Sequence, residues 1–208
     1  MHPTDVLKTE HRIIEQVLSC LDRIAEACAR RGRLDAASAV LALDFFHNFA
    51  DGCHHAKEEQ HLFPLLEVRG FRREGGPTGV MFAEHDQGRR YLSGMRAAVD
   101  GAAAGDGDAV LQFILHARAY VGLLREHIRK EDHCLFPMAE QALSDADRDE
   151  LLESFGSVEH DEPGAGAHEK YLRIAAELAQ RWGVLRAQGD ADPECVACGH
   201  PASLVRIR

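Results

Sequence analysis

Two copies of one short pattern constrain how this sequence folds more than any other feature does. Residues 54–64 read HHAKEEQHLFP and residues 127–137 read HIRKEDHCLFP. In each copy a histidine stands four residues before a glutamate, so the two side chains share one face of a helix. A histidine and a carboxylate stacked in this way, followed by an apolar Leu-Phe pair, can close on a metal ion inside a helical bundle. The repetition predicts two such helices in one domain.

A single histidine precedes each copy at nearly the same distance. His11 follows Glu10, and His85 follows Glu84. Each of these histidines lies on a stripe of apolar residues at helical spacing, which marks both as positions on a buried face. Residues 1–142 therefore look like a duplicated helical hairpin. Two hairpins with short loops make an antiparallel bundle.

The helical pattern covers most of the chain, and no alternating strand pattern is found. Thr4 or Asp5 is expected to cap the first helix, and Pro64 is expected to end or kink the second. Helices are expected over 4–31, 35–68, 77–100, 108–142, 144–155 and 167–188, with a loop over 101–108 and a turn over 159–166. The predicted fold class is all-α, an antiparallel up-down four-helix bundle with added C-terminal helices. The expected divisions are the bundle over 1–142, a helical extension packing on it over 143–188, and a tail over 189–208.

The ordered pattern H…HxxxE…H…HxxxE supplies six candidate metal ligands. Taken singly, each has an ordinary explanation, since a lone histidine on an apolar stripe is often a hydrogen-bonded core residue and a lone HxxxE pair is often solvated. A buried carboxylate, however, is costly unless it is paired or bound to a metal. Two carboxylates entering one core together with four histidines favour a metal site. The six residues are His11, His54, Glu58, His85, His127 and Glu131.

This arrangement resembles the hemerythrin-like family, the bundles also called HHE cation-binding domains, over about residues 4–142. The resemblance implies two non-haem iron ions bridged by Glu58, by Glu131 and by an oxo or hydroxo group, with the four histidines completing the site. Mixed imidazole and carboxylate donors suit iron, and manganese or zinc are alternatives. A small-molecule ligand such as dioxygen, peroxide or nitric oxide would take an open position.

The sequence departs from the oxygen-carrying hemerythrins, which have a further histidine one turn after the third-helix histidine. Arg89 stands at that position here, which counts against simple reversible oxygen carriage. His168 is a candidate additional metal ligand because it begins the apolar seam of the last expected helix, which runs through Tyr171 to Leu185. Tyr171 is a candidate ligand or hydrogen-bond partner, and Tyr120 or Tyr171 is expected to line the open side of the site.

Neighbouring residues receive lesser roles. Glu59 and Asp132 follow the two candidate ligand glutamates and are candidates for hydrogen bonds to the ligand imidazoles. His55, His61 and His133 lie off the ligand face of an α-helix and are expected at the surface.

The sequence CVACGH at 195–200 contains one CxxC, which is half of a zinc knuckle. Its donors Cys195, Cys198 and His200 either hold a structural metal with a partner or lie in a metal-free tail.

Composition limits the partners and the compartment. The formal net charge is −10 and the isoelectric point is about 5.7, which argues against binding to nucleic acid or to an anionic membrane. No run approaches the roughly 18 apolar residues of a membrane span, and residues 1–11 contain no apolar signal core. Apart from Cys195 and Cys198, the six cysteines are scattered through the expected helices, unlike those of a disulfide-stapled secreted domain. We expect a cytoplasmic protein without membrane or nucleic-acid partners. The sequence leaves its oligomeric state open.

Three functions fit these features. The first is a non-haem di-iron protein that binds or reacts with small oxidants in oxidative or nitrosative stress defence, with catalase-like, peroxidase-like or nitric-oxide-related turnover left open. The second is a reversible oxygen or nitric oxide binding or sensing protein without turnover. The third is a structural zinc bundle. Carboxylate-rich mixed donors favour iron over zinc, so the first two are preferred. Arg89 and the added helix count against pure oxygen carriage, so the first is the prediction and the second is the alternative.

Overall fold

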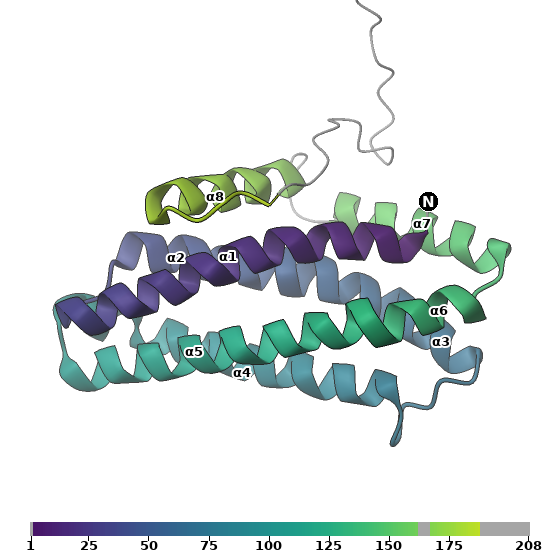
Figure 1. The fold of residues 1–208 in the computed structure, drawn as a ribbon, viewed down its shortest axis with the longest axis horizontal. Coiled ribbons are helices and arrows are strands. Elements are labelled where there is room, and N and C mark those ends of the chain that lie inside the picture. The colour runs from purple at the N-terminus through teal and green to yellow at the C-terminus, as the bar shows by residue number, and fades with distance from the viewer. Residues whose placement is uncertain (1, 162–166, 188–208) are drawn as a thin grey trace, which may run out of the picture.

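Four long helical segments run lengthwise through the molecule (Figure 1). The structure is a computed structural model that describes residues 2–161 and 167–187. This part of the chain is all helical and contains no strand, which confirms the expected fold class at that level. Within it, every helix is too short or too polar to cross a membrane. The elements are α1 (Pro3–Arg31), α2 (Ala36–Phe45), η1 (Phe46–His55), η2 (Glu58–Leu62), α3 (Phe63–Val68), α4 (Pro77–Ala104), α5 (Gly107–Lys130), η3 (Glu131–Leu135), α6 (Phe136–Ala142), α7 (Asp145–Asp161) and α8 (Ala167–Trp182).

The segment from α2 to α3 and the segment from α5 to α6 each form one long helical rod that includes π-helical turns, in which hydrogen bonds span five residues instead of four. α4 packs on α5, α5 on α1, α1 on α2, and α2 on α4. The later helices lie on this group: α8 packs on α1 and α2, while α7 contacts α1 and η2 (Figure 1). The six candidate ligands come from all four long segments.

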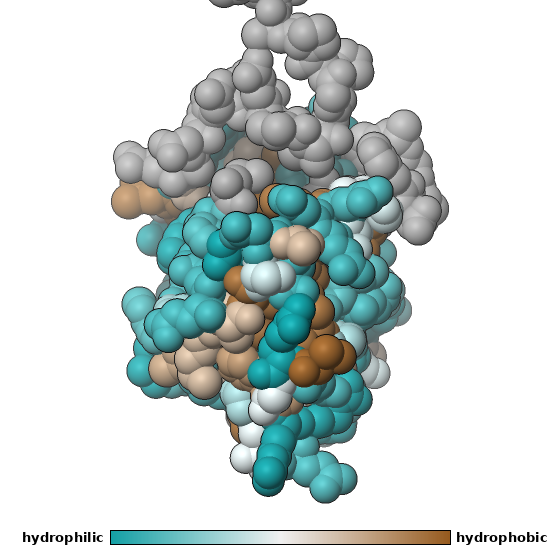
Figure 2. All heavy atoms as spheres, turned by 90° about the vertical axis from the view of Figure 1, so that its right-hand side faces the viewer, coloured by the Kyte–Doolittle hydropathy of each residue, from teal (hydrophilic) through white to brown (hydrophobic). Residues whose placement is uncertain are grey.

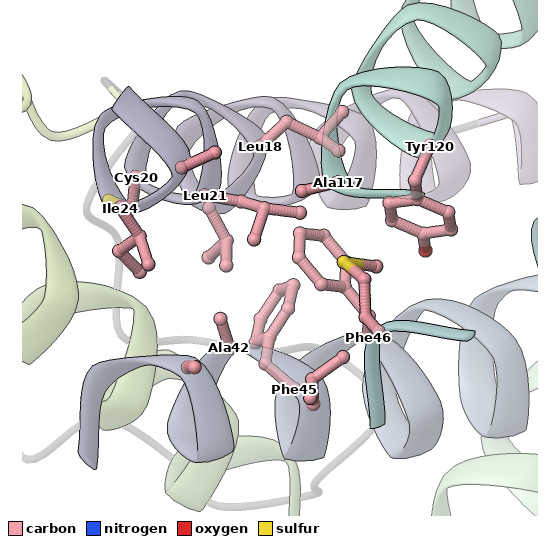
Figure 3. Packing of buried hydrophobic residues seen from close by; sticks show 14 of the residues in the cluster. Leu18, Cys20, Leu21, Ile24, Ala42, Phe45, Phe46, Ala117 and Tyr120 are labelled. Carbon is pink, nitrogen blue, oxygen red and sulfur yellow. The ribbon is translucent and has the colours of Figure 1, made fainter. Parts of the chain in front are cut away.

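The apolar core falls into two clusters of buried side chains. The larger one lies between α1, α2, α4, α5 and α8, and Figure 3 shows Leu18, Leu21, Phe45 and Phe46 meeting inside it. Burying each such side chain contributes roughly 1.5–3 kcal/mol. The smaller cluster includes buried side chains of α3, α6 and α7. Seen from that end of the molecule, apolar side chains collect near the centre with hydrophilic ones around them (Figure 2).

The candidate ligands stand between these two clusters along every long segment. On α1, for example, Leu7 belongs to the smaller cluster and Ile14 to the larger one, with His11 between them. The same order holds on α5, η3 and α6, where Leu124 and Leu135 flank His127 and Glu131. Apolar packing on both sides therefore holds a polar layer between the two clusters.

Both prolines of the Leu-Phe-Pro pattern follow a π-helical turn. The backbone N–H of Phe63 bonds the carbonyl of Glu58, and the N–H of Phe136 bonds the carbonyl of Glu131, each five residues back. A proline in an α-helix clashes with the carbonyl four residues earlier. Here the wider turn precedes Pro64, so the helix continues to Val68 rather than ending at the proline. Each π-turn begins at a candidate ligand glutamate.

Several helix boundaries differ from those expected. The first helix is capped at His2, whose backbone N–H donates to the Asp5 carboxylate at 2.8 Å, so Thr4 and Asp5 lie inside it. Residues 101–104 are helical rather than a loop. α4 ends where Gly105 adopts a left-handed φ of 87°, and Asp106 caps the next helix. These two residues alone make the connection.

The C-terminal helices also differ. Ser144 and Asp147 form a reciprocal cap: the Ser144 N–H donates to Asp147 Oδ2 at 2.8 Å, and the Asp147 N–H donates to Ser144 Oγ at 3.2 Å. α7 then runs on to Asp161, so 159–161 are helical, while 162–166 lie outside the described residues. α8 stops at Trp182 because Gly183 has a φ of 63°. Leu185 is consequently 92% exposed and does not extend the apolar seam. The tail residues 188–208, including the CVACGH sequence, lie outside the described part.

Candidate metal centre

All six candidate ligands are buried, and the structure brings them together in one place. His11, Glu58, His85 and Glu131 are 0% exposed. The pattern of the sequence explains this convergence, because each residue occupies the inward face of its helical segment at the same level along the bundle. Two carboxylates and four imidazoles thus share one water-poor layer.

The two glutamates sit between histidines from both halves of the repeat. Glu131 Oε2 lies 3.3 Å from His11 Nε2 and 3.1 Å from His127 Nε2. Glu58 Oε1 lies 3.6 Å from His54 Nε2, and its other oxygen lies 3.5 Å from His85 Nε2. Each carboxylate therefore faces one histidine from its own hairpin and one from the other hairpin. The two glutamates therefore link the donors of the two hairpins.

Several donor atoms in this layer are buried without any hydrogen-bond partner. They include Nε2 of His11, Nε2 of His54, and both carboxylate oxygens of Glu58 and of Glu131. A buried polar atom left unpaired costs about 1–3 kcal/mol. These unpaired nitrogen and oxygen atoms face one another, and all are of types that bind transition metals. They therefore fit a bound metal centre. The residues present therefore suit the ions that the sequence pattern implies.

Without a metal, the negative charges of the two glutamates would repel each other. Burial and the neighbouring charge of Glu131 raise the pKa of Glu58 well above its usual value. Burial would also raise the pKa of Glu131, but the charge of His127 and the close approach of His11 hold that pKa well below its usual value. A metal cation would remove this conflict by allowing both carboxylates to ionise.

A fifth histidine, His55, joins the same layer. It is only 4% exposed, so the expectation of a surface position was wrong. The donor atoms of His55, Glu58, His85 and His127 all lie within 4.8 Å of one another. The cause is the π-helical segment η1, which ends at His55 and changes the angular spacing of an α-helix, so that adjacent His54 and His55 both face inward. The His-His pair was the only sequence signal.

The donors form two four-residue groups that share Glu58. The first group is His55, Glu58, His85 and His127, and the second is His11, His54, Glu58 and Glu131. Each group could hold one metal ion with imidazole and carboxylate donors. We call them the His55 group and the His11 group.

Every histidine of the site has its other ring nitrogen against a carboxylate. The Nδ1 atoms of His11, His54 and His85 lie 2.8 Å from Asp132, 2.9 Å from Glu10 and 2.7 Å from Glu59. Such carboxylates fix the ring orientation and leave Nε2 free to bind a metal. The remaining pairs are His127 with Glu84 at 3.0 Å and His55 with Asp51 at 3.3 Å.

The sequence identified only two of these five carboxylates. Glu59 and Asp132 make the expected contacts to ligand imidazoles. Glu10, Glu84 and Asp51 were missed. The repeated Glu-His pairs at 10–11 and 84–85 were the available signal, because each glutamate serves the HxxxE histidine of its own hairpin.

Other expected site residues lie elsewhere. The ring of His168 stands 5.6 Å from that of Phe49, and His168 belongs to neither donor group. The hydroxyl of Tyr171 accepts a hydrogen bond from Lys170, and its ring packs near Phe45 and Phe49.

Tyr120 is a core residue whose ring lies 4.9 Å from that of Phe46 (Figure 3). His133 is exposed and His61 is half-buried. These residues remain outside the layer of donors.

Comparison with known proteins agrees with this geometry. The sequence profile of the hemerythrin HHE cation binding domain matches residues 2–139. The chain belongs to the hemerythrin HHE cation-binding family. The matched range contains all the donors of both groups and their outer carboxylates.

Individual relatives of this family member are more distant. The uncharacterized protein Rv1995 of Mycobacterium tuberculosis is 26% identical over 186 residues, 88% of this chain and 70% of the relative. An equally similar relative is the uncharacterized protein Mb2018 of Mycobacterium bovis. The iron-sulfur cluster repair protein YtfE of Dickeya chrysanthemi is 31% identical over 88 residues, covering 41% of this chain and 40% of that protein. No solved structure matches the chain significantly.

Proposed function

We propose that this protein is a non-haem di-iron protein that binds or reacts with dioxygen, peroxide or nitric oxide in oxidative or nitrosative stress defence. The observation that carries the proposal is the pair of four-donor groups that share Glu58. Two adjacent groups joined by one carboxylate fit a pair of ions better than a single ion. Glu131, placed between His11 and His127, would join the same two ions.

The donor types support iron. Imidazole suits several transition metals, and carboxylate suits hard cations, so a mixture of both is typical of iron; manganese and zinc are the alternatives. The partial similarity to a protein named for iron-sulfur cluster repair is consistent with iron and with stress defence. Bound iron would supply one-electron and oxygen chemistry.

The protein's own residues would bind the ions, orient the histidine rings and cover the site. The imidazoles and the two glutamates would hold the ions, and the five outer carboxylates would fix the rings. Aromatic rings cover the site: Phe136 stacks on His11 at 5.5 Å, and Phe63 stacks on His85 at 5.9 Å. Each group offers four donors, so an ion that accepts more than four ligands would keep room for a small molecule.

Reversible binding or sensing without turnover is the second candidate function. The position of His55 favours it, because this residue supplies a fifth imidazole to the site. The oxygen carriers have their fifth histidine on the third helix, where this chain has Arg89. The absence of that third-helix histidine therefore does not leave the His55 group short of a neutral donor.

We further propose that residues 1–142 form the metal-binding domain and that the 143–188 extension covers it. The contacts of α7 and α8 with α1, α2 and η2 support this division. A cytoplasmic location is also inferred. Within the described residues, Cys20, Cys28 and Cys134 are free thiols, as is usual in a reducing compartment.

Metal content measured by mass spectrometry tests the proposal, followed by optical spectra with and without peroxide. Two irons per chain with rapid oxygen evolution would support turnover, and two irons with a stable nitric oxide or dioxygen adduct would support binding. Zinc in place of iron, in protein grown with both metals, would contradict both functions.

A further inference from the structure

The outer carboxylates of the site are themselves each paired with a cation. Glu10 accepts a hydrogen bond from Lys57, and Glu84 accepts one from Lys130. Asp132 lies 3.2 Å from Arg12. These three histidine–carboxylate–cation chains serve His54, His127 and His11, one cation for each carboxylate.

The two remaining carboxylates share a single cation, Arg89. Its Nε donates to Asp51 Oδ1 at 2.9 Å, and its Nη2 donates to Glu59 Oε1 at 2.8 Å. Its third nitrogen bonds Asp86, which is on the same helix. A planar guanidinium with fixed donor directions can hold two carboxylates at a set separation, which a single ammonium group cannot.

The oxygen atoms that Arg89 holds are the same ones that face the imidazoles. Asp51 Oδ1 lies 3.3 Å from His55 Nδ1, and Glu59 Oε1 lies 2.7 Å from His85 Nδ1. These partners come from η1, η2 and α4. Arg89 therefore connects the supports of two histidines that lie on different helices.

We propose that Arg89 is a positioning residue that fixes His55 and His85 as ligands of one metal position. The inference rests on the proposed two-metal function and deepens it. Without the guanidinium, two carboxylates would face each other with like charge, and both imidazoles would lose a fixed partner. His11 and His54 are held by Asp132 and Glu10, which Arg89 does not contact in the structure. Its loss should therefore weaken metal binding by the His55 group and leave the ion of the His11 group in place.

The place of Arg89 also explains why an arginine is useful there. One turn after His85, Arg89 holds the carboxylates of Asp51 and Glu59, which in turn contact the candidate ligand histidines. The missing imidazole comes instead from His55 on the neighbouring π-helix. The Arg89 side chain is 37% exposed, so its replacement does not open a core cavity and the fold should tolerate it.

The test compares R89M and R89K with R90M as a matched control. Arg90 is the next residue on the helix and bonds only Gln87 among the described contacts. Anaerobic titration with iron(II) should show one of the two metal equivalents weakened about 10- to 100-fold in R89M, as is typical when an outer partner of a ligand is lost. R89K should fall between R89M and the native protein, and R90M should match the native protein. The proposal would be overturned if both equivalents bound to R89M with native affinity, or if R89M weakened both equivalents to the same extent.

A second readout needs no metal. Nitrogen-15 NMR of the histidine rings in the metal-free protein reports which ring nitrogen carries the proton. In the native protein and R90M, His55 and His85 should be protonated at Nδ1. In R89M these two rings should show mixed tautomers, while His11 and His54 keep their native signals. Native signals for His55 and His85 in R89M would overturn the role of Arg89. If the native protein fails to bind two metals, the proposed function falls, and the NMR comparison still decides the role of Arg89.

Discussion

The rings of His55 and His85 stack with their centroids 3.8 Å apart and their planes within 13°. One ring belongs to η1 and the other to α4, so the contact joins the two halves of the sequence repeat. His85 is the lone histidine of the second half, whereas His55 has no counterpart in the repeat, because residue 128 is Ile128. The two donor groups are therefore unequal, with three histidines in one and two in the other.

Removing Glu58 should empty both metal positions. The residue belongs to both donor groups, so Glu58→Ala deletes a ligand from each. Mass spectrometry of the purified variant should find little iron. Glu67→Ala is the matched control, because Glu67 pairs with Arg73 away from the site and its loss should leave the iron content unchanged. Two irons in the Glu58 variant would contradict the assignment of Glu58 as the shared ligand.

The fifth histidine can be tested by comparing His55→Ala with His168→Ala. We expect the first change to weaken one metal equivalent by at least about 10-fold, because removing a ligand should cost no less than removing its outer partner. We expect the second change to leave both equivalents intact, since His168 stands against Phe49 and outside both groups. Calorimetric titration with iron(II) distinguishes them. Loss of metal in the His168 variant alone would restore the original sequence-based assignment.

The sequence was sufficient to predict the helical fold and to name the six donors that converge. Helical period and repetition carry that information, since residues four apart share a face wherever the backbone is helical. The same reasoning misplaced His55, because it assumed α-helical spacing through residues 46–55. A π-helical segment changes the angle between successive residues, and single-sequence periodicity does not report it.

The outer carboxylates were predicted less well for a different reason. Glu59 and Asp132 are next to ligand glutamates in the sequence and could be suspected from that alone. Glu10 reaches His54 through packing between helices, which sequence spacing does not specify. Asp51 stands four residues before His55 and was missed because His55 itself was expected at the surface. The prediction of a loop over 101–108 was wrong for residues 101–104, because three alanines sustain the helix to Ala104 despite Gly101.

The larger apolar cluster should dominate the stability of the fold. Phe46 is 0% exposed, and its ring contacts those of Phe45 and Tyr120. Phe46→Ala should lower the free energy of unfolding by about 3–5 kcal/mol, through lost burial and the cavity left behind. Leu111→Ala, at a position that is 52% exposed, should change it by less than about 0.5 kcal/mol. Urea denaturation of the metal-free proteins measures both, and similar values for the two variants would contradict the assigned core.

The metal-free protein should become less stable as the pH rises from neutral to alkaline values. Burial alone would lower the pKa of His127, but the charge and close approach of Glu131 and the hydrogen bond to Glu84 raise it to about 9. A histidine in the unfolded chain has a pKa of about 6.5. The stabilising contribution of protonated His127 is therefore complete below pH 6.5 and is lost as the pH rises through 9. Melting temperatures of the metal-free protein between pH 6.5 and 9 should fall, and His127→Gln should flatten that slope, whereas the exposed His133→Gln should retain it. Parallel slopes in His127→Gln and the native protein would show that His127 holds no such proton, and the charge arrangement assigned to the empty site would be wrong.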